Sequence, residues 1–299
     1  MNQMLIAATI GDTLDTSMHS FDMAIYRFFG GIQSDFMTVI AKIFTSFGDE
    51  NFVIPIMIMG LILFLFKRTR KYGAALFLSI AIGTLITNLA LKPLVLRVRP
   101  YNTLQGIEEY WNWYVNAGML SESDYSFPSG HTTAAFEMAV SMCFCFAHDK
   151  RKKLAAVFPV IAVLVACSRI YLMVHYPTDV IGGVLAGIIA GLAGYFLAVL
   201  IAKAFSKHEK LDNTLDLGRV FKKKPSTKVI GAVFAVVCAA VLCFSFVNLM
   251  REGGEETLRC AYDGEYDCQN EARVDEEKYP PIDGEYYCKI HWNELNDAA

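Results

Sequence analysis

The stretch "VIGGVLAGIIAGLAGYFLAVLIA", residues 180–202, contains no charged side chain. A helix rises about 1.5 Å per residue, so a helix of this length crosses the roughly 30 Å hydrocarbon core of a bilayer. The whole chain has 299 residues, of which 54% are hydrophobic and 19% are charged. Soluble domains carry about 25% charged residues. The sequence therefore predicts an integral membrane protein.

Further apolar blocks divide the chain into predicted spans. They lie at 35–47, which is short for a span, and at 52–66, 73–96, 132–147, 154–174 and 229–250. Residues 18–31 place apolar side chains at helical spacing with a polar opposite face, which is typical of an interfacial helix. We expect an all-α, polytopic membrane bundle with a six-helix core, one extra C-terminal span and a small acidic tail.

Loop charges predict the orientation of this bundle. Residues 67–71 and 148–153 each contain four basic side chains, and residues 203–228 contain eight against three acidic ones. Lys and Arg prefer the cytoplasmic side, and helix parity places these three segments together. The protein is thus expected in the cell membrane as a multi-pass protein with the other loops outside. No basic patch with interleaved aromatic residues suggests nucleic acid.

Composition also predicts the limits of the units along the chain. They are an N-terminal segment at 1–17, the membrane core at 18–202, a basic cytoplasmic linker at 203–228, an extra transmembrane helix at 229–250 and an extracytoplasmic tail at 251–299. The tail contains fourteen acidic and five basic residues. Partner docking, substrate gating and a merely solvated appendage all remain open as its role.

The motif "PSGH", residues 128–131, opens the predicted span at 132–147. Ser129 is a good N-cap, and Gly130 lets the backbone approach a ligand closely. The free N–H groups and the dipole of a helix N-terminus attract anions. His131 adds a side chain that exchanges a proton near neutral pH. The motif alone also fits an ordinary capped helix start.

A second motif, "LKPLVLRVRP", ends the span at 73–96. Lys92 and Arg99 are seven residues apart and share one face if the helix continues, until Pro100 ends it. Charges beside a span are costly and usually face a functional interior. Arg97 is a third cation of this motif. Snorkelling toward lipid headgroups is the alternative interpretation, and it suits Arg97 better than the deeper Lys92.

A third motif, "CSRIYLMVHYPTDVIGG", joins two spans. Arg169 lies near the outer end of one, His175 lies in the loop, and Asp179 opens the next. His175 and Asp179 are four residues apart, so the carboxylate can orient the imidazole. A lone pair at this spacing is also common in purely structural roles.

All three motifs fall on the same membrane face and together suit a phosphate group. Arginine presents a planar donor fork that fits phosphate oxygens. Two histidines suit a displacement in which one attacks phosphorus and the other protonates the leaving oxygen. The motifs contain one carboxylate, Asp179, so we expect no metal cluster in the core and no cofactor. Fixed cations would neutralise the charge instead.

Written as K-x6-RP (Lys92 to Pro100), PSGH and SR-x5-H-x3-D (Ser168 to Asp179), the chain resembles the type 2 phosphatidic acid phosphatase superfamily over about residues 18–202. The resemblance implies a six-helix membrane core and metal-independent phosphate hydrolysis at the extracytoplasmic surface.

The same resemblance implies roles for individual residues. His175 would be the nucleophile that forms a phosphohistidine, Asp179 would orient it, and His131 would protonate the leaving group and then assist water. The residues implied to hold the phosphate oxygens are Lys92, Arg99, Ser129, Gly130 and Arg169. Ser168 belongs to the motif without an assigned role.

The expected function is hydrolysis of a membrane lipid phosphate or diphosphate, such as undecaprenyl diphosphate, phosphatidylglycerophosphate or phosphatidic acid. One alternative is a phosphotransferase with the same intermediate. Another is a non-enzymatic lipid-binding or transport protein. The related vanadate-holding haloperoxidases fit poorly, because the motifs lie on membrane spans.

The tryptophans and the cysteines outside the motifs each allow more than one interpretation. Trp111 and Trp113 favour the membrane interface and could form a lid or only an anchor. In the tail, Cys260, Cys268 and Cys288 could form a disulfide with one thiol left over, remain free thiols, or bind zinc with His291. The cysteines expected to pack in spans as small apolar residues are Cys143, Cys145, Cys167, Cys238 and Cys243.

Overall fold

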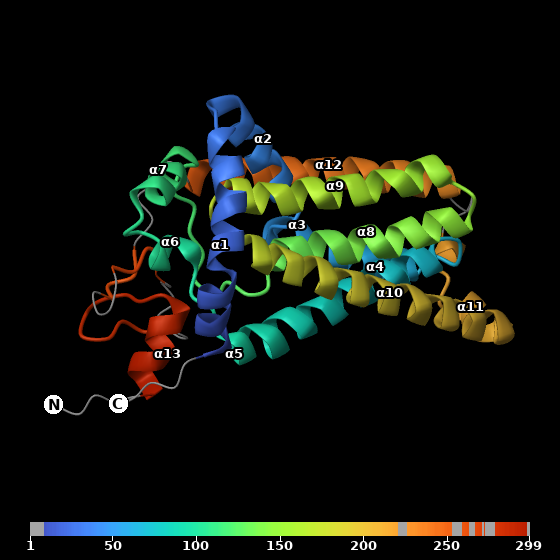
Figure 1. Cartoon of the computed structure of the whole chain (residues 1–299). Helices are drawn as coiled ribbons and strands as arrows, with labels where there is room; N and C mark the ends of the chain where they lie inside the picture. Colours follow the sequence, from blue (N-terminus) through green and yellow to red (C-terminus); the bar gives the residue numbers. More distant parts are fainter. Residues whose placement is uncertain are drawn as a thin grey trace.

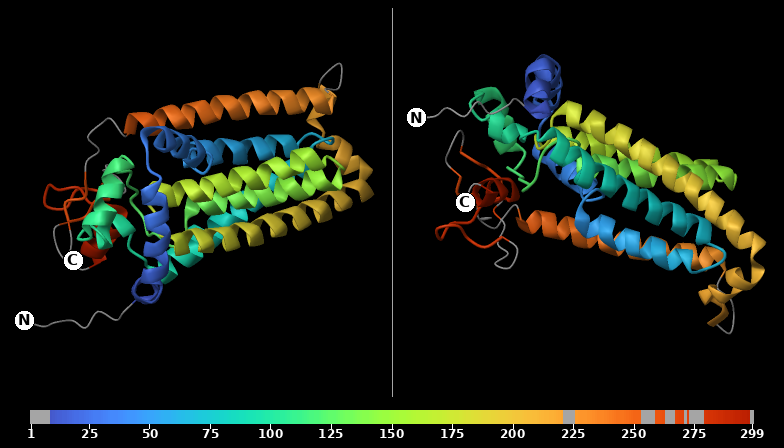
Figure 2. Two further views of the ribbon diagram at one scale, coloured as in Figure 1. Left: turned by 45° about the horizontal axis from the view of Figure 1, so that its top comes forward. Right: turned by 90° about the horizontal axis from the view of Figure 1, so that it is seen from below.

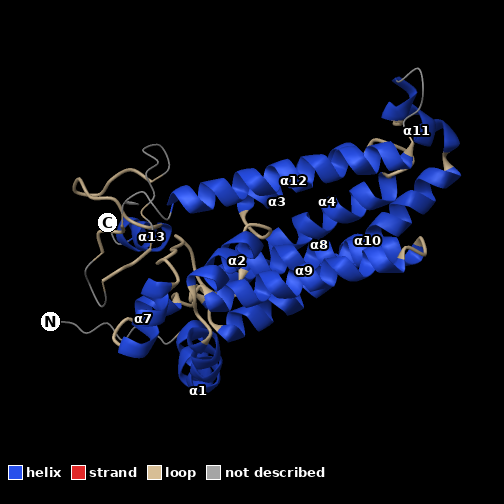
Figure 3. Cartoon of the chain, turned by 90° about the horizontal axis from the view of Figure 1, so that it is seen from above, coloured by secondary structure: helices blue, strands red, loops and turns tan. Residues whose placement is uncertain are grey.

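The computed structural model describes residues 9–220, 226–252, 259–262, 267–270, 272 and 279–297. These residues form helices joined by loops, with no β-strand among them (Figure 3), which confirms the predicted all-α class. The helices are α1 (Ile10–Gly31), α2 (Asp35–Thr45), α3 (Glu50–Phe64), α4 (Arg70–Thr84), α5 (Lys92–Val95), α6 (Pro100–Thr103), α7 (Glu108–Asn116), α8 (Gly130–His148), α9 (Lys152–Tyr171), α10 (Pro177–Lys207), α11 (Glu209–Thr214), α12 (Thr227–Glu252) and α13 (Lys289–Asp297).

Helices α3, α4, α8, α9, α10 and α12 run side by side as a bundle (Figures 1 and 2). Among the described residues, five segments are long and apolar enough to cross a membrane: Asp35–Phe64, Arg70–Thr103, Lys152–Tyr171, Pro177–Lys207 and Val229–Met250. Helix α8 is not among these five segments, because it carries polar side chains such as Glu137 and Ser141. Helices α4, α9 and α10 surround it and shield these side chains from lipid. The chain is therefore a multi-pass membrane protein.

Glycines spaced four apart on α10 let it approach α8 closely. A Cβ atom on Gly183 would lie 2.7 Å from the carbonyl oxygen of Ser129, and one on Gly187 would lie 2.7 Å from that of Thr133. Small residues at this spacing are a common means of packing membrane helices. The close approach holds the PSGH end of α8 beside the first turn of α10.

The N-terminal third differs from the predicted series of spans. Residues 35–47 and 52–66, predicted as two spans, form one candidate crossing, Asp35–Phe64. Helix α2 has 11 residues, too few for the roughly 20 that a span needs, and a turn at 46–49 connects it to α3. The predicted interfacial segment at 18–31 belongs to α1, which lies across one end of the bundle (Figure 1).

The two ends of the bundle differ in what they carry. The basic turns before α4 and before α9 lie at the end that also carries α11, as helix parity predicts. The three phosphate motifs, α1, α6, α7 and the described part of the tail lie at the opposite end (Figure 1). Residues 221–225 of the predicted linker lie outside the described residues.

Helix α12 lies at the edge of the bundle, against α2 and α3. Only 6% of its most apolar stretch is buried, and large side chains such as Val233, Val236 and Phe244 are exposed. An exposed apolar face of this length suits contact with lipid. The extra C-terminal span therefore adds to the core without entering its centre.

The glycine contact between α10 and α8 generates a stability prediction. In Gly187→Ala, the new methyl group meets the Thr133 carbonyl and, at 2.6 Å, the Phe136 Cβ atom, so the helices must separate. Overpacking of this kind costs about 1–3 kcal/mol. We expect a lower Tm in detergent. The matched control is Gly231→Ala on α12, where the new atom meets nothing within 4 Å. An unchanged or higher Tm for Gly187→Ala would contradict the proposed close packing.

Candidate active site

The three motifs meet at one end of the bundle, although one of them does so differently from the prediction. The helix that carries Lys92 ends at Val95, because Leu96 adopts a left-handed conformation (φ 55°). Lys92 and Arg99 therefore do not share a helical face. Arg99 reaches the site from an extended segment, and Pro100 begins α6 instead of ending a helix.

His175 is buried in the loop between α9 and α10, and its two ring nitrogens face different groups. Its Nδ1 atom lies 3.5 Å from Oδ2 of Asp179 and 3.4 Å from the Ser126 hydroxyl. Its Nε2 atom lies 3.2 Å from a guanidinium nitrogen of Arg99. Burial and the positive charge of Arg99 lower the pKa of His175 to about 4. The imidazole is therefore neutral at pH 7, with Nε2 directed at the cations.

Asp179 is held in place by several donors. Arg97 donates to Oδ1 at 2.6 Å, and the backbone N–H of Tyr176 and the Ser126 hydroxyl donate to Oδ2. This carboxylate begins α10, where the helix dipole favours a negative charge. Its position relative to the His175 ring is thus determined by three separate segments of the chain.

Arg97 is fully buried, which rules out the alternative that it snorkels toward headgroups. Its guanidinium also contacts Asp15 at 2.7 Å and Asp22 at 3.0 Å, both on α1, and its Cζ atom lies 3.7 Å from the centre of the Tyr176 ring. Three carboxylates offset the cost of burying one guanidinium. No pattern in the sequence pointed to these two α1 carboxylates, which lie more than 70 positions away from Arg97.

The remaining cations of the motifs converge on Glu122 and Asp124, two residues of the loop between α7 and α8. Arg99 donates to both carboxylates at 2.5 Å. Arg169 pairs with Glu122, and Lys92 pairs with Asp124. Neither acid is predictable from the sequence, because nothing in the loop "LSESDY" (residues 120–125) distinguishes them from surface acids.

Electrostatics shows how strongly this pocket favours negative charge. Burial by itself would raise the pKa of Glu122, but Arg99 and Arg169 outweigh it and hold that pKa well below its usual range. Lys92 and Arg99 likewise lower the pKa of Asp124 against the effect of burial. Both carboxylates are therefore ionised, and the cations form a site for more than one negative charge.

The Glu122 carboxylate lies between the two motif histidines. Its Oε1 atom is 3.8 Å from Nδ1 of His131, and its Oε2 atom is 4.0 Å from Nε2 of His175. His131 also lies 4.0 Å from Asp49, at the start of α3. An anionic group thus occupies the space where the histidines and arginines converge.

A cavity of about 640 Å³ adjoins this point. Lys92, Gly130, His131, Glu122 and Asp124 are part of its lining. It extends along α8 to Glu137, between α3 and the helical stretch from α4 to α5.

Ser129, Trp111 and Trp113 do not line this cavity. The buried Ser129 hydroxyl caps α8 and accepts from the Thr132 N–H at 3.4 Å. The Trp113 ring lies directly under Gly30 of α1, and neither it nor Trp111 lines the cavity. These contacts favour the anchoring interpretation of the tryptophans over the lid.

The tail residues proposed from the sequence as zinc ligands also lie together. The side chains of Cys260, Cys268, Cys288 and His291 are buried, and their ligand atoms all lie within 4.8 Å of one another. In the described part of the chain, no other such group of histidine, cysteine and acidic side chains is found.

Comparison with known proteins supports the motif assignment. The sequence model of the PAP2 superfamily matches residues 72–203, which include all three motifs. Phosphatidylglycerophosphatase B of Bacillus subtilis (strain 168) is 32% identical over 194 residues, covering 62% of this chain and 86% of that protein. An undecaprenyl-diphosphatase of Sulfolobus acidocaldarius is 31% identical over 170 residues, covering 56% and 73%. A transmembrane PAP2-type phosphatidylglycerolphosphate phosphatase from Bacillus subtilis has a crystal structure with a TM-score of 0.50 and 26% identity, covering 67% of this chain and 91% of that one.

Removing the Glu122 charge should strengthen anion binding at this site. In Glu122→Gln, inorganic phosphate no longer competes with a carboxylate for Arg99 and Arg169, so we expect its Kd to fall about tenfold, roughly 1.4 kcal/mol. Calorimetric titration of the detergent-purified protein measures this change. The control is Glu109→Gln, whose exposed pair with Arg27 is remote from the motifs. Unchanged or weaker phosphate binding in Glu122→Gln would mean that Glu122 supports the cations instead of competing for them.

Proposed function

The chain belongs to the PAP2 superfamily, and we propose that it hydrolyses a membrane lipid phosphate or diphosphate at the extracytoplasmic face through a phosphohistidine on His175. The observation that carries this proposal is the position of Glu122. A carboxylate held by Arg99 and Arg169, with one histidine nitrogen about 4 Å away on either side, marks a phosphoryl position between a nucleophile and a proton donor.

The geometry favours Nε2 of His175 as the attacking atom. Asp179 faces Nδ1, so it holds the tautomer with the proton on Nδ1 and stabilises the positive charge that develops on the ring. Nε2 forms a bond to phosphorus while the bond from phosphorus to the lipid oxygen breaks. His131 takes up a proton when the negative charge of the substrate lies beside it, and gives that proton to the leaving oxygen.

The second step returns the enzyme to its starting state. His131 takes a proton from water, the water oxygen bonds to phosphorus, and the N–P bond to His175 breaks to release inorganic phosphate. Arg99, Arg169 and Lys92 stabilise the negative charge on the phosphoryl oxygens in both steps. These fixed cations support metal-independent chemistry. Displacement of Glu122 and Asp124 by the substrate would precede the first step.

The cavity supports a lipid as the substrate. Its polar part holds Lys92 and His131, whereas Val53, Ile54 and Leu96 give it an apolar side toward α3 and α5. Ile54 is also exposed on the face of the bundle that would meet lipid. A phosphate headgroup can thus bind at the cations while its chain lies along α3.

The relatives bear on the substrate, and the loop charges bear on the membrane face. Relatives named for phosphatidylglycerophosphate and undecaprenyl diphosphate make these two lipids the leading candidates, with phosphatidic acid as a third. The basic segments at the opposite end of the bundle support an extracytoplasmic site. A phosphotransferase that uses the same intermediate is the alternative if phosphate leaves only when an acceptor is added.

Phosphate release from these three lipids tests the proposed function. We expect the detergent-purified protein to release phosphate from at least one of them in magnesium-free buffer. His175→Ala should abolish release because no N–P bond can form, and His131→Ala should lower kcat by about 10²–10⁴-fold. His148→Ala, a histidine at the opposite end of the bundle, serves as the control. Full activity of His175→Ala would refute the phosphohistidine mechanism.

The titration of His175 gives a separate check. Because burial and Arg99 lower its pKa to about 4, the ring should stay neutral as the pH falls from 7 to 5 and become protonated only near pH 4. NMR of histidine-labelled protein, with His175→Gln to assign the signal, measures this midpoint. A midpoint near the ordinary value of about 6.5 would show that the ring is hydrated and its nucleophilic nitrogen is not shielded.

A further inference from the structure

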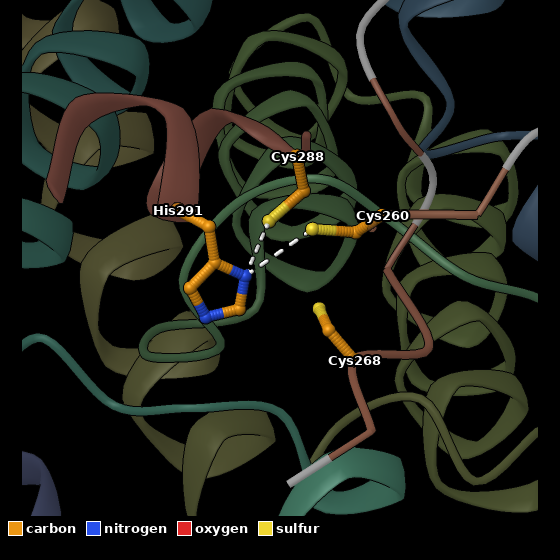
Figure 4. Close-up of side chains that lie close together, drawn as sticks. All are labelled: Cys260, Cys268, Cys288 and His291. Atoms are coloured by element: carbon orange, nitrogen blue, oxygen red, sulfur yellow. Dashed lines mark hydrogen bonds between the residues drawn. The ribbon is translucent and has the colours of Figure 1, made fainter. Parts of the chain in front are cut away.

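Three cysteines and one histidine of the tail direct their ligand atoms at a common point (Figure 4). Cys288 directly precedes α13 and His291 lies in its first turn, while Cys260 and Cys268 come from irregular segments. Nδ1 of His291 lies 3.3 Å from Sγ of Cys260 and 3.4 Å from Sγ of Cys288. Cys268 approaches the same space from the other side (Figure 4).

This set of atoms matches the ligands of a structural zinc site. Thiolate and imidazole bind Zn²⁺ at about 2.3 Å and about 2.0 Å, which separates tetrahedral ligands by roughly 3.5–3.8 Å. The observed atoms lie within 4.8 Å of one another, so small movements bring all four to one ion. A disulfide would use only two of the thiols and gives no reason for the third thiol and the imidazole to converge.

Two contacts around the cluster resemble those that orient zinc ligands. The Asn270 side chain donates from Nδ2 to Sγ of Cys288 at 3.4 Å, and the Tyr262 ring stacks on His291 with 3.8 Å between centres. Outer contacts of this kind fix ligand orientation in metal sites. The three cysteines are also buried together with Ile290 in a core too small to fold a unit by itself.

We propose that Cys260, Cys268, Cys288 and His291 bind one Zn²⁺ ion, which folds the tail into a compact unit. The ion replaces the missing hydrophobic core, as in other small metal-bound units. This site is distinct from the phosphate pocket, and its existence does not depend on the proposed phosphatase activity.

The proposed zinc unit lies beside the cavity of the phosphate pocket. Lys289, Ile290 and Asn293 of α13 line the same cavity as Lys92 and His131. The zinc unit therefore forms an outer wall of that cavity.

Hydrogen bonds also connect the unit to the loop that carries Glu122. The Tyr101 hydroxyl donates to Oδ1 of Asn270 at 3.0 Å and accepts from the Glu122 N–H at 3.0 Å. Asn102 accepts from the Gln269 N–H at 2.9 Å. A chain of direct contacts thus runs from the ligand Cys288 through Asn270 and Tyr101 to the acid in the phosphate pocket.

Metal analysis of the full-length protein tests the proposal. Protein purified in detergent without chelators should contain close to one zinc ion per chain, and Cys268→Ser and Cys288→Ser should each lose most of it. The matched control is Cys243→Ser, an exposed thiol on α12, which should keep its zinc. Zinc content is measured independently of activity, so inactive protein with bound zinc would refute only the proposed function.

Cobalt substitution covers the case in which these variants do not fold. Co²⁺ added to the reduced, zinc-depleted wild-type protein should give thiolate-to-cobalt charge-transfer bands and the strong visible bands of tetrahedral coordination. Either of two results would overturn the proposal. One is wild-type protein that binds neither metal after reduction. The other is a mass two hydrogens lower, with a tail disulfide found by peptide mapping.

Discussion

The buried guanidinium of Arg97 is the interaction on which the rest of the site depends. It joins Asp179 of α10 to Asp15 and Asp22 of α1, and thereby connects three segments distant in sequence. Leaving a buried charge without its partner costs about 3–5 kcal/mol, so the segments are held together by the need to pair that charge. The orientation of His175 follows, because Asp179, which Arg97 holds in place, faces its Nδ1 atom. The crosswise helix α1 is thus part of the support of the site.

The phosphate pocket presents the opposite electrostatic problem, since it gathers cations instead of acids. Arg99, Arg169 and Lys92 lie close together at a buried point, where like charges repel strongly. Glu122 and Asp124 offset two of these three positive charges. Under the proposed function, an entering phosphate must replace these carboxylates, so its net affinity would be the difference between two strong interactions.

The tail changes the surroundings of the pocket without contributing to the core. Its α13 lines the cavity, and Asn270 contacts the loop that carries Glu122 through Tyr101. The PAP2 match ends at residue 203, well before this unit. Under the proposed function, this outer wall would limit which headgroups reach the cations without any change in the proposed catalytic residues.

The sequence by itself determined the membrane bundle, the end of the bundle at which the three motifs meet, and the residues of those motifs. These features are local: apolar runs must match the bilayer, and basic residues between them mark one side. Only the tertiary structure decided the single crossing by α2 and α3, and the end of the helix at Leu96. It also decided the partners of Arg97 and of the cations Lys92, Arg99 and Arg169. Arg97 pairs with Asp22 across 75 positions and Arg169 with Glu122 across 47, and short-range patterns do not record such pairs. The charges must be satisfied where folding brings them together, and that place is set by helix packing rather than by neighbours in the chain.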